Sequence, residues 1–164
     1  MTKTIRRRQI QASNTPVRAA LKTDSTLLNI VKDGLGAVVV SHRSYFDEGV
    51  RSLFGDSLDI DAALKEGKEQ ENRWDYLLGH TQSNKIIGVE PHSAENSEIT
   101  TVIKKRKAAL SQLQEHLRAG VLVSKWLWVA SGRVQFAPME KATLRLAQNG
   151  IEFVGRKIKN KHFS

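Results

Sequence analysis

The chain has 164 residues and no cysteine, which excludes disulfides, thiolate metal sites and cysteine nucleophiles. No apolar run approaches the roughly 18 residues of a membrane span, and the basic start is followed by polar residues rather than an apolar signal core. We therefore expect one soluble domain in the cytoplasm, and its net charge of +9 indicates a polyanionic partner, with no membrane association.

The excess of basic residues is concentrated in three parts of the chain. A single basic tail often only solubilises a protein, but three clusters favour phosphate binding, and therefore a nucleic acid. Stacking of single-stranded bases is less well supported, because only 6% of the residues are aromatic. The clusters are Lys3 with Arg6, Arg7 and Arg8; Lys104, Lys105, Arg106 and Lys107; and Arg156, Lys157, Lys159 and Lys161.

Residues 1–24 are predicted to form a basic, flexible arm ahead of a single domain over residues 25–164. The first apolar groups of that domain predict a short helix over 25–32, a strand over 37–40 and one or two helical turns over 45–54.

A longer helix is predicted from Asp56 or Ser57 to about Asn72. Glu71 would extend its buried stripe by one turn, which makes it a candidate third carboxylate, with Glu69 in reserve. The alternative is that the last turn frays and Glu71 is solvated. The stripe consists of apolar residues and a glycine at helical spacing, namely Ile60, Ala63, Leu64 and Gly67.

A β-hairpin is predicted from two apolar arms, residues 74–80 and 85–92, joined by a polar stretch of four residues. If pairing is symmetric about that stretch, Asp75 lies directly opposite Glu90. Side chains opposed in this way have Cβ atoms roughly 4.5–5.5 Å apart, and like charges there repel. The alternatives are a solvated edge that exposes both acids, or a register slip that separates them.

Two carboxylates held together beside an apolar core are most simply explained by a divalent cation, because Mg²⁺ is held by one or two carboxylates with water and phosphate. His92 lies two residues beyond Glu90 and so shares its face. Gly79 and Gly88 fall on the same face, where they either admit a nucleic-acid backbone or relieve crowding.

The remaining elements alternate between helix and strand. A helix is expected from Asn96 or Ser97 to about Arg118, a central strand over 125–130, a helix that begins at Pro138, and a last strand over 151–154.

From residue 56 onward this order resembles the core of the PD-(D/E)xK nuclease superfamily, the restriction-endonuclease-like fold. The resemblance implies an α/β fold with a mixed sheet flanked by helices, here with a basic N-terminal extension. Asp75 and then Glu90-Pro91-His92 match its motif, and Glu71 stands for the glutamate of the preceding helix. The departure is His92, which occupies the place of the motif's lysine.

The resemblance implies a site in which Asp75 and Glu90 bind Mg²⁺ or Mn²⁺ and His92 orients or accepts a proton. Alternatively, Lys104 or Lys105 reaches in from the following helix as a displaced lysine. Phosphate contacts are expected from basic residues of the first two clusters, namely Lys104, Lys105, Arg106, Arg6, Arg7 and Arg8.

The leading hypothesis is a metal-dependent endonuclease that hydrolyses phosphodiester bonds, with DNA favoured over RNA. A homodimer or larger complex is compatible with double-strand cutting. The missing lysine favours a rival hypothesis, a non-catalytic nucleic-acid-binding module on the same fold. A third hypothesis is a basic subunit of a larger assembly.

Overall fold

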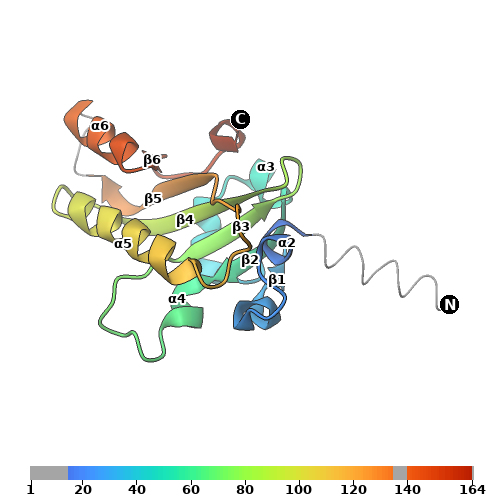
Figure 1. Ribbon diagram of the computed structural model, residues 1–164. Coiled ribbons are helices and arrows are strands. Elements are labelled where there is room, and N and C mark those ends of the chain that lie inside the picture. The colour runs from blue at the N-terminus through green and yellow to red at the C-terminus, as the bar shows by residue number, and fades with distance from the viewer. Residues whose placement is uncertain (1–14, 135–139, 164) are drawn as a thin grey trace, which may run out of the picture.

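A computed structural model describes residues 15–134 and 140–163 of the protein, which form a six-stranded mixed sheet with helices on its faces (Figure 1). The strands lie side by side in chain order, antiparallel from β1 to β4 and parallel from β4 to β6. They are β1 (Lys32–Asp33), β2 (Phe54–Asp59), β3 (Tyr76–His80), β4 (Lys85–Ala94), β5 (Lys125–Val134) and β6 (Ile151–Phe153).

The two parallel connections are helical, as parallel strands require. Helix α5 (Glu98–Leu113) joins β4 to β5, and α6 (Glu140–Gln148) joins β5 to β6. The other helices are short: α2 (Pro16–Ala20), α3 (Glu48–Arg51), α4 (Ile60–Leu64) and the 3-10 helices η1 (Thr26–Ile30), η2 (Val40–Tyr45) and η3 (Asn160–Phe163). In the part of the chain described, no helix is both long and apolar enough to cross a membrane.

Each face of the sheet has its own hydrophobic core. On one face α2, α5 and α6 pack against residues such as Leu77 and Trp128. On the other, residues of α3 and the C-terminal segment cover Leu78 and Val129. The side chains of each central strand alternate between the two cores, which explains why these strands are apolar on both faces.

The hairpin prediction is confirmed, including its register. His80 pairs with Lys85 and Tyr76 with Val89, so that Asp75 and Glu90 fall opposite each other one step further on. The four-residue connection forms a turn, with Asn84 at φ 54°.

The predicted helix over residues 56–72 is wrong. Residues 54–59 form β2 instead, paired with β3, and only Ile60–Leu64 is helical. Residues 65–72 carry only polar side chains and Gly67, and they form exposed turns because they offer nothing to bury. Pairing with β3 from Phe54 to Asp59 overrides the helical spacing of the apolar residues further along.

Two N-terminal predictions also change. Residues 37–40 form a turn rather than a strand, and Val39 and Val40 remain exposed. The predicted arm of residues 1–24 is too long, because α2 packs into the core with Val17 and Leu21 both 0% exposed. Arg6, Arg7, Arg8 and Pro138 lie outside the described residues.

Candidate functional site

Asp75 and Glu90, called the acid pair below, meet at one end of the central strands. Asp75 directly precedes β3, where its carbonyl accepts a hydrogen bond from Ile60 N at 2.8 Å. Glu90 sits inside β4 and is 0% exposed. The two carboxyl groups are close enough for each to influence the pKa of the other. The juxtaposition expected from the hairpin is therefore present, on the face of the sheet that α5 covers.

Lys105 joins this pair from the second turn of α5. Its Nζ lies 3.1 and 3.3 Å from the two carboxylate oxygens of Glu90. The side chain is only 19% exposed, because α5 packs closely over the sheet through Val102 and Ala109. Of the two candidates for a displaced lysine, the structure brings Lys105 to the acids and leaves Lys104 exposed on the helix surface.

The protonation of the acid pair is strongly perturbed. Burial, followed by the charge of Asp75, raises the pKa of Glu90 well above 4.5, and Lys105 only partly opposes this. The pKa of Asp75 is also raised, chiefly by burial and further by Asp61, against the lowering effect of Lys105. Both carboxyl groups therefore resist ionisation more than exposed acids do, because burial and their mutual repulsion disfavour the charged forms.

A second polar group lies on the opposite face at the same end of the sheet. Tyr76 follows Asp75 directly, and its hydroxyl lies 2.7 Å from His42 Nδ1 and accepts a hydrogen bond from Val39 N at 3.3 Å. Burial, together with nearby carboxylates including Asp59, raises the pKa of Tyr76 to about 12, so the phenol stays protonated.

Asp59 is the acid that sequence reasoning missed. It ends β2 opposite Tyr76, and burial raises its pKa, with a smaller contribution from Asp61. The incorrect helix over 56–72 concealed it. No local periodicity marked this segment as a strand, because Phe54 and Leu58 lie in the cores of opposite faces of the sheet.

His92 does not take the lysine's position. Its Nε2 lies 2.8 Å from Glu98 Oε2 in the first turn of α5, and its carbonyl accepts a hydrogen bond from Trp128 Nε1. The imidazole is therefore engaged with the helix N-terminus, whereas Lys105 contacts the acid pair.

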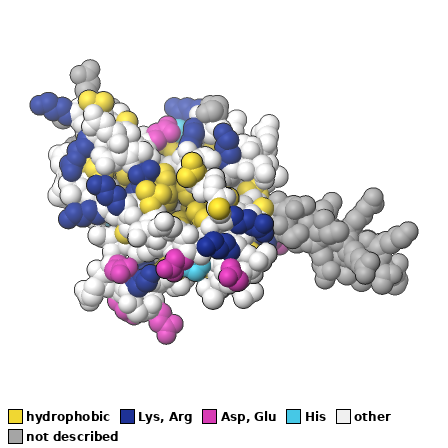
Figure 2. All heavy atoms as spheres, in the orientation of Figure 1, with side chains coloured by type: hydrophobic (Ala, Val, Ile, Leu, Met, Phe, Trp, Pro, Cys, Tyr) yellow, Lys and Arg dark blue, Asp and Glu magenta, His cyan; other side chains and the backbone are white. Residues whose placement is uncertain are grey.

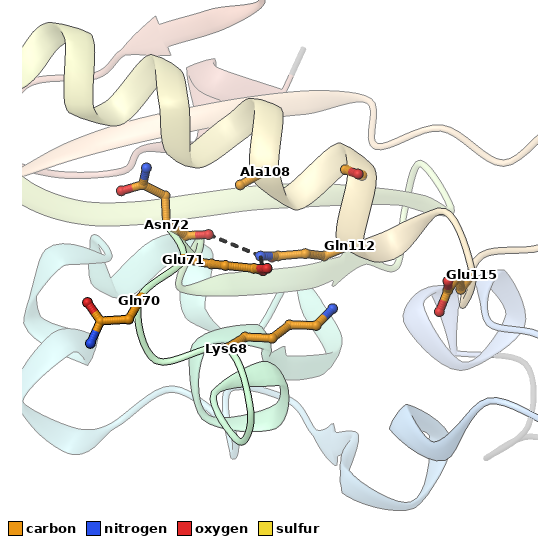
Figure 3. A pocket seen from close by; sticks show the side chains of 8 residues that line it. Lys68, Gln70, Glu71, Asn72, Ala108, Gln112 and Glu115 are labelled. Carbon is orange, nitrogen blue, oxygen red and sulfur yellow. Dashed lines mark hydrogen bonds between the residues drawn. The ribbon is translucent and has the colours of Figure 1, made fainter.

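Glu71 lies on an exposed loop and lines a cavity of about 500 Å³ between that loop and α5 (Figure 3). Its carboxylate accepts a hydrogen bond from Gln112 Nε2 at 3.2 Å, drawn as a dashed line in the figure. Glu71 does not extend a buried helical stripe. The alternative prediction, a solvated Glu71, agrees with its exposed position in this cavity wall. The other lining residues are Lys68, Gln70, Asn72, Ala108, Ser111, Gln112 and Glu115.

The Arg106 side chain packs against neighbouring residues and is only partly exposed. Its guanidinium lies 5.6 Å from the ring centroid of Trp126, and the turn at Gly150 (φ 72°) leaves room for it. Burial lowers its pKa. A phosphate contact by Arg106 would require this packing to open.

Crowding explains the two glycines on the face of the acids. A Cβ on Gly79 would come within 2.0 Å of Asp56 Oδ1, and one on Gly88 within 2.6 Å of Trp126 Cε3. Asp56 is buried there because it accepts hydrogen bonds from Val17 N and Arg18 N of α2. These glycines therefore permit close packing of α2 and of Trp126.

The acid pair offers hard oxygen donors of the kind that Mg²⁺ prefers. Within residues 15–134 and 140–163, no cluster of three or more acidic, histidine or cysteine side chains is arranged to hold a metal. A cation at this pair would therefore need water or substrate oxygens to complete its shell.

Comparisons with models of protein families, with curated proteins and with solved structures found no match to this chain. The case for a function therefore depends on the chemistry of the site.

Proposed function

We propose that this protein is a metal-dependent nuclease with the restriction-endonuclease-like fold, and that it hydrolyses phosphodiester bonds, in DNA more readily than in RNA. The observation that carries the proposal is the acid pair, set face to face by the hairpin register, with the Lys105 ammonium 3.1 Å from Glu90. Two carboxylates and one lysine are the side chains of the motif that the sequence resembles.

The sheet supports the same family. An antiparallel meander, β2 to β4, is followed by a helix and a parallel strand. Of the two acids, Asp75 directly precedes β3 and Glu90 lies in β4. The lysine comes from α5 rather than from the position of His92. Lys105 approaches Glu90 from the helix. Its ammonium group would therefore replace the lysine that the motif has at the position of His92.

The acid pair fits a divalent cation. A buried carboxylate that retains its proton for lack of compensating charge is stabilised in its ionised form when a cation replaces the proton. Asp75 and Glu90 would hold the ion. When bound, Mg²⁺ would stabilise charge on the phosphate and lower the pKa of a bound water.

Lys105 would stabilise the negative charge that develops on the phosphate during hydrolysis. Hydrolysis forms a bond from a water oxygen to phosphorus and breaks the bond to the leaving oxygen, which takes up a proton. An ammonium group at the acid pair can donate a hydrogen bond to a phosphate oxygen or to the attacking water. Its placement by a packed helix keeps it oriented before substrate binds.

The surface around this site suits a polyanion. Figure 2 shows Lys and Arg side chains grouped over α5 and α6. Arg145 Nη2 donates to Thr100 Oγ1 at 2.9 Å and joins the two helices. Lys104 and Lys107 are exposed on α5, beside Lys105. We expect these groups to contact backbone phosphates.

The test is cleavage of plasmid DNA and of a structured RNA in the presence of Mg²⁺ or Mn²⁺. Asp75→Asn and Lys105→Met are expected to reduce cleavage at least about 100-fold while retaining binding. Lys32→Met, which removes one exposed positive charge from the edge strand β1, should cleave normally. Intact substrates together with no calorimetric Mn²⁺ binding by the wild type would overturn the proposal.

The engagement of His92 by Glu98 favours one alternative, a non-catalytic nucleic-acid-binding module. In that case Asp75→Ala should leave salt-sensitive binding unchanged or stronger, and no variant should alter cleavage, because the wild type has none.

A further inference from the structure

A small pocket of about 230 Å³ lies on the segment that follows β6. It is lined almost entirely by basic residues: Val154, Arg156, Lys157, Lys159, Lys161 and His162. Arg156, Lys157 and Lys159 are exposed, and among the residues described none of the three lies within 4.0 Å of an acidic group. Dark blue side chains gather beside the C-terminal turn, at the top of Figure 2.

The backbone of this segment is held by contacts with neighbouring elements. Ile158 is 0% exposed and forms an isolated bridge with Phe46. The fixed backbone therefore keeps the positively charged side chains close together although they repel one another. The backbone also needs no ordering when an anion binds. Three carbonyls are tied to neighbouring elements: Gly155 to Ala130 N (2.7 Å), Ile158 to Asp47 N (2.9 Å) and His162 to Lys125 Nζ (2.7 Å).

The uncharged ring of His162 forms one side of the pocket. It is only 7% exposed, and its Nδ1 accepts a hydrogen bond from Lys159 N at 2.9 Å. Because Nδ1 is an acceptor, the hydrogen of the neutral ring is on Nε2, which is a donor. Burial, followed by the surrounding lysines, lowers the pKa of His162 against the opposing effect of Glu152, which keeps the ring neutral.

We propose that this basic pocket binds a phosphate group of a nucleic-acid backbone, as an anchor separate from the acid pair. The chemistry fits, because several cations and a ring donor surround a space large enough for one phosphate and few carboxylates oppose it. The inference rests on the nucleic-acid partner of the proposed function, but not on cleavage.

The sheet relates the anchor to the acid pair. Glu90 pairs with Trp128, which pairs with Phe153, so these three residues lie in line across β4, β5 and β6. Two strand spacings amount to about 10 Å. The basic segment begins directly after Phe153. The acid pair faces α5, whereas the basic segment covers the opposite face of the sheet, so the two sites would contact different parts of a nucleic acid.

The experiment measures binding of a labelled DNA duplex by fluorescence anisotropy across a series of salt concentrations. All proteins carry Asp75→Asn and the buffer contains EDTA, so that no strand is cut. Lys157→Gln/Lys159→Gln should make the plot of log affinity against log salt shallower by about 2, with affinity about 10–100-fold lower at 0.1 M salt. Lys22→Gln/Lys32→Gln, an equal charge loss at two exposed residues outside the pocket, should leave the slope unchanged.

An unchanged slope for the first variant, an equal change in both variants, or no duplex binding by any protein would overturn the proposal. A second arm follows the His162 ring signals by NMR during titration with inorganic phosphate. Shifts with inorganic phosphate together with an unchanged duplex slope would assign the pocket to a small phosphorylated molecule and overturn the polymer anchor. Duplex binding with the expected slope but no cleavage by the wild type would refute only the nuclease proposal.

Discussion

Replacing Glu90 by glutamine should stabilise the folded protein at pH 8 and abolish metal binding. At an effective dielectric constant of about 20, unit charges about 3 Å apart interact by about 5 kcal/mol. The attraction from Lys105 at 3.1 Å is opposed by repulsion from an ionised Asp75. The cost of desolvating a fully buried carboxylate, several kcal/mol, is left uncompensated.

The sign of the pH dependence follows from the raised pKa. Glu90 holds its proton more tightly in the folded chain than in the unfolded chain. The stability linked to that proton is fully present below pH 4.5, the ordinary pKa, and is lost as the pH rises through the folded-state pKa. Glutamine cannot ionise, so Glu90→Gln escapes this loss. Relative to wild type, its unfolding free energy should increase by about 1–3 kcal/mol between pH 5 and pH 8.

Urea unfolding, followed by the fluorescence of the buried residues Trp74, Trp126 and Trp128, measures this difference. Glu66→Gln, which removes an exposed carboxylate from the neighbouring loop, should follow the wild type at both pH values. If Glu90→Gln instead loses stability relative to wild type as the pH rises, the ionised Glu90–Lys105 bridge is stabilising and the reasoning is refuted.

Three other outcomes follow from the same contacts. Mn²⁺ binding at the acid pair should release a proton, so the affinity should fall by up to about tenfold for each unit by which the pH is lowered. Calorimetry in two buffers of different ionisation enthalpy measures the proton release, and a binding enthalpy that is equal in both buffers would contradict it. Asp56→Asn should lower the unfolding free energy by about 2 kcal/mol in urea titrations, because the buried carboxylate holds two amide groups of α2; an unchanged midpoint would disprove that role. Gly79→Ala should cost more than about 2 kcal/mol, whereas Gly49→Ala, whose Cβ meets only a contact of 3.7 Å, should be nearly neutral, and equal effects would argue against crowding at Gly79.

The acid pair was predictable because its determinants are local. Two apolar arms and a four-residue connection define one hairpin register, and that register sets Asp75 opposite Glu90 without reference to the rest of the chain. The periodicity of the sequence also predicted helix α5 and strand β5 after it, although α5 ends at Leu113 rather than near Arg118.

Segment 54–59 shows where local reasoning fails. Its apolar residues fit a helix as well as a strand, and the choice depends on pairing with β3 and on the bonds from Asp56 to α2, 38 and 39 residues away. Because these partners are distant in sequence, no local periodicity reports them.

The sequence by itself determined that two acids face each other on a hairpin, and it left open whether His92, Lys104 or Lys105 supplies the nearby charge. The tertiary structure alone decided for Lys105, because that choice depends on how α5 rotates and packs over β4. Helix packing is set by the shape of a core drawn from the whole chain, whereas a hairpin register is set by its own few residues.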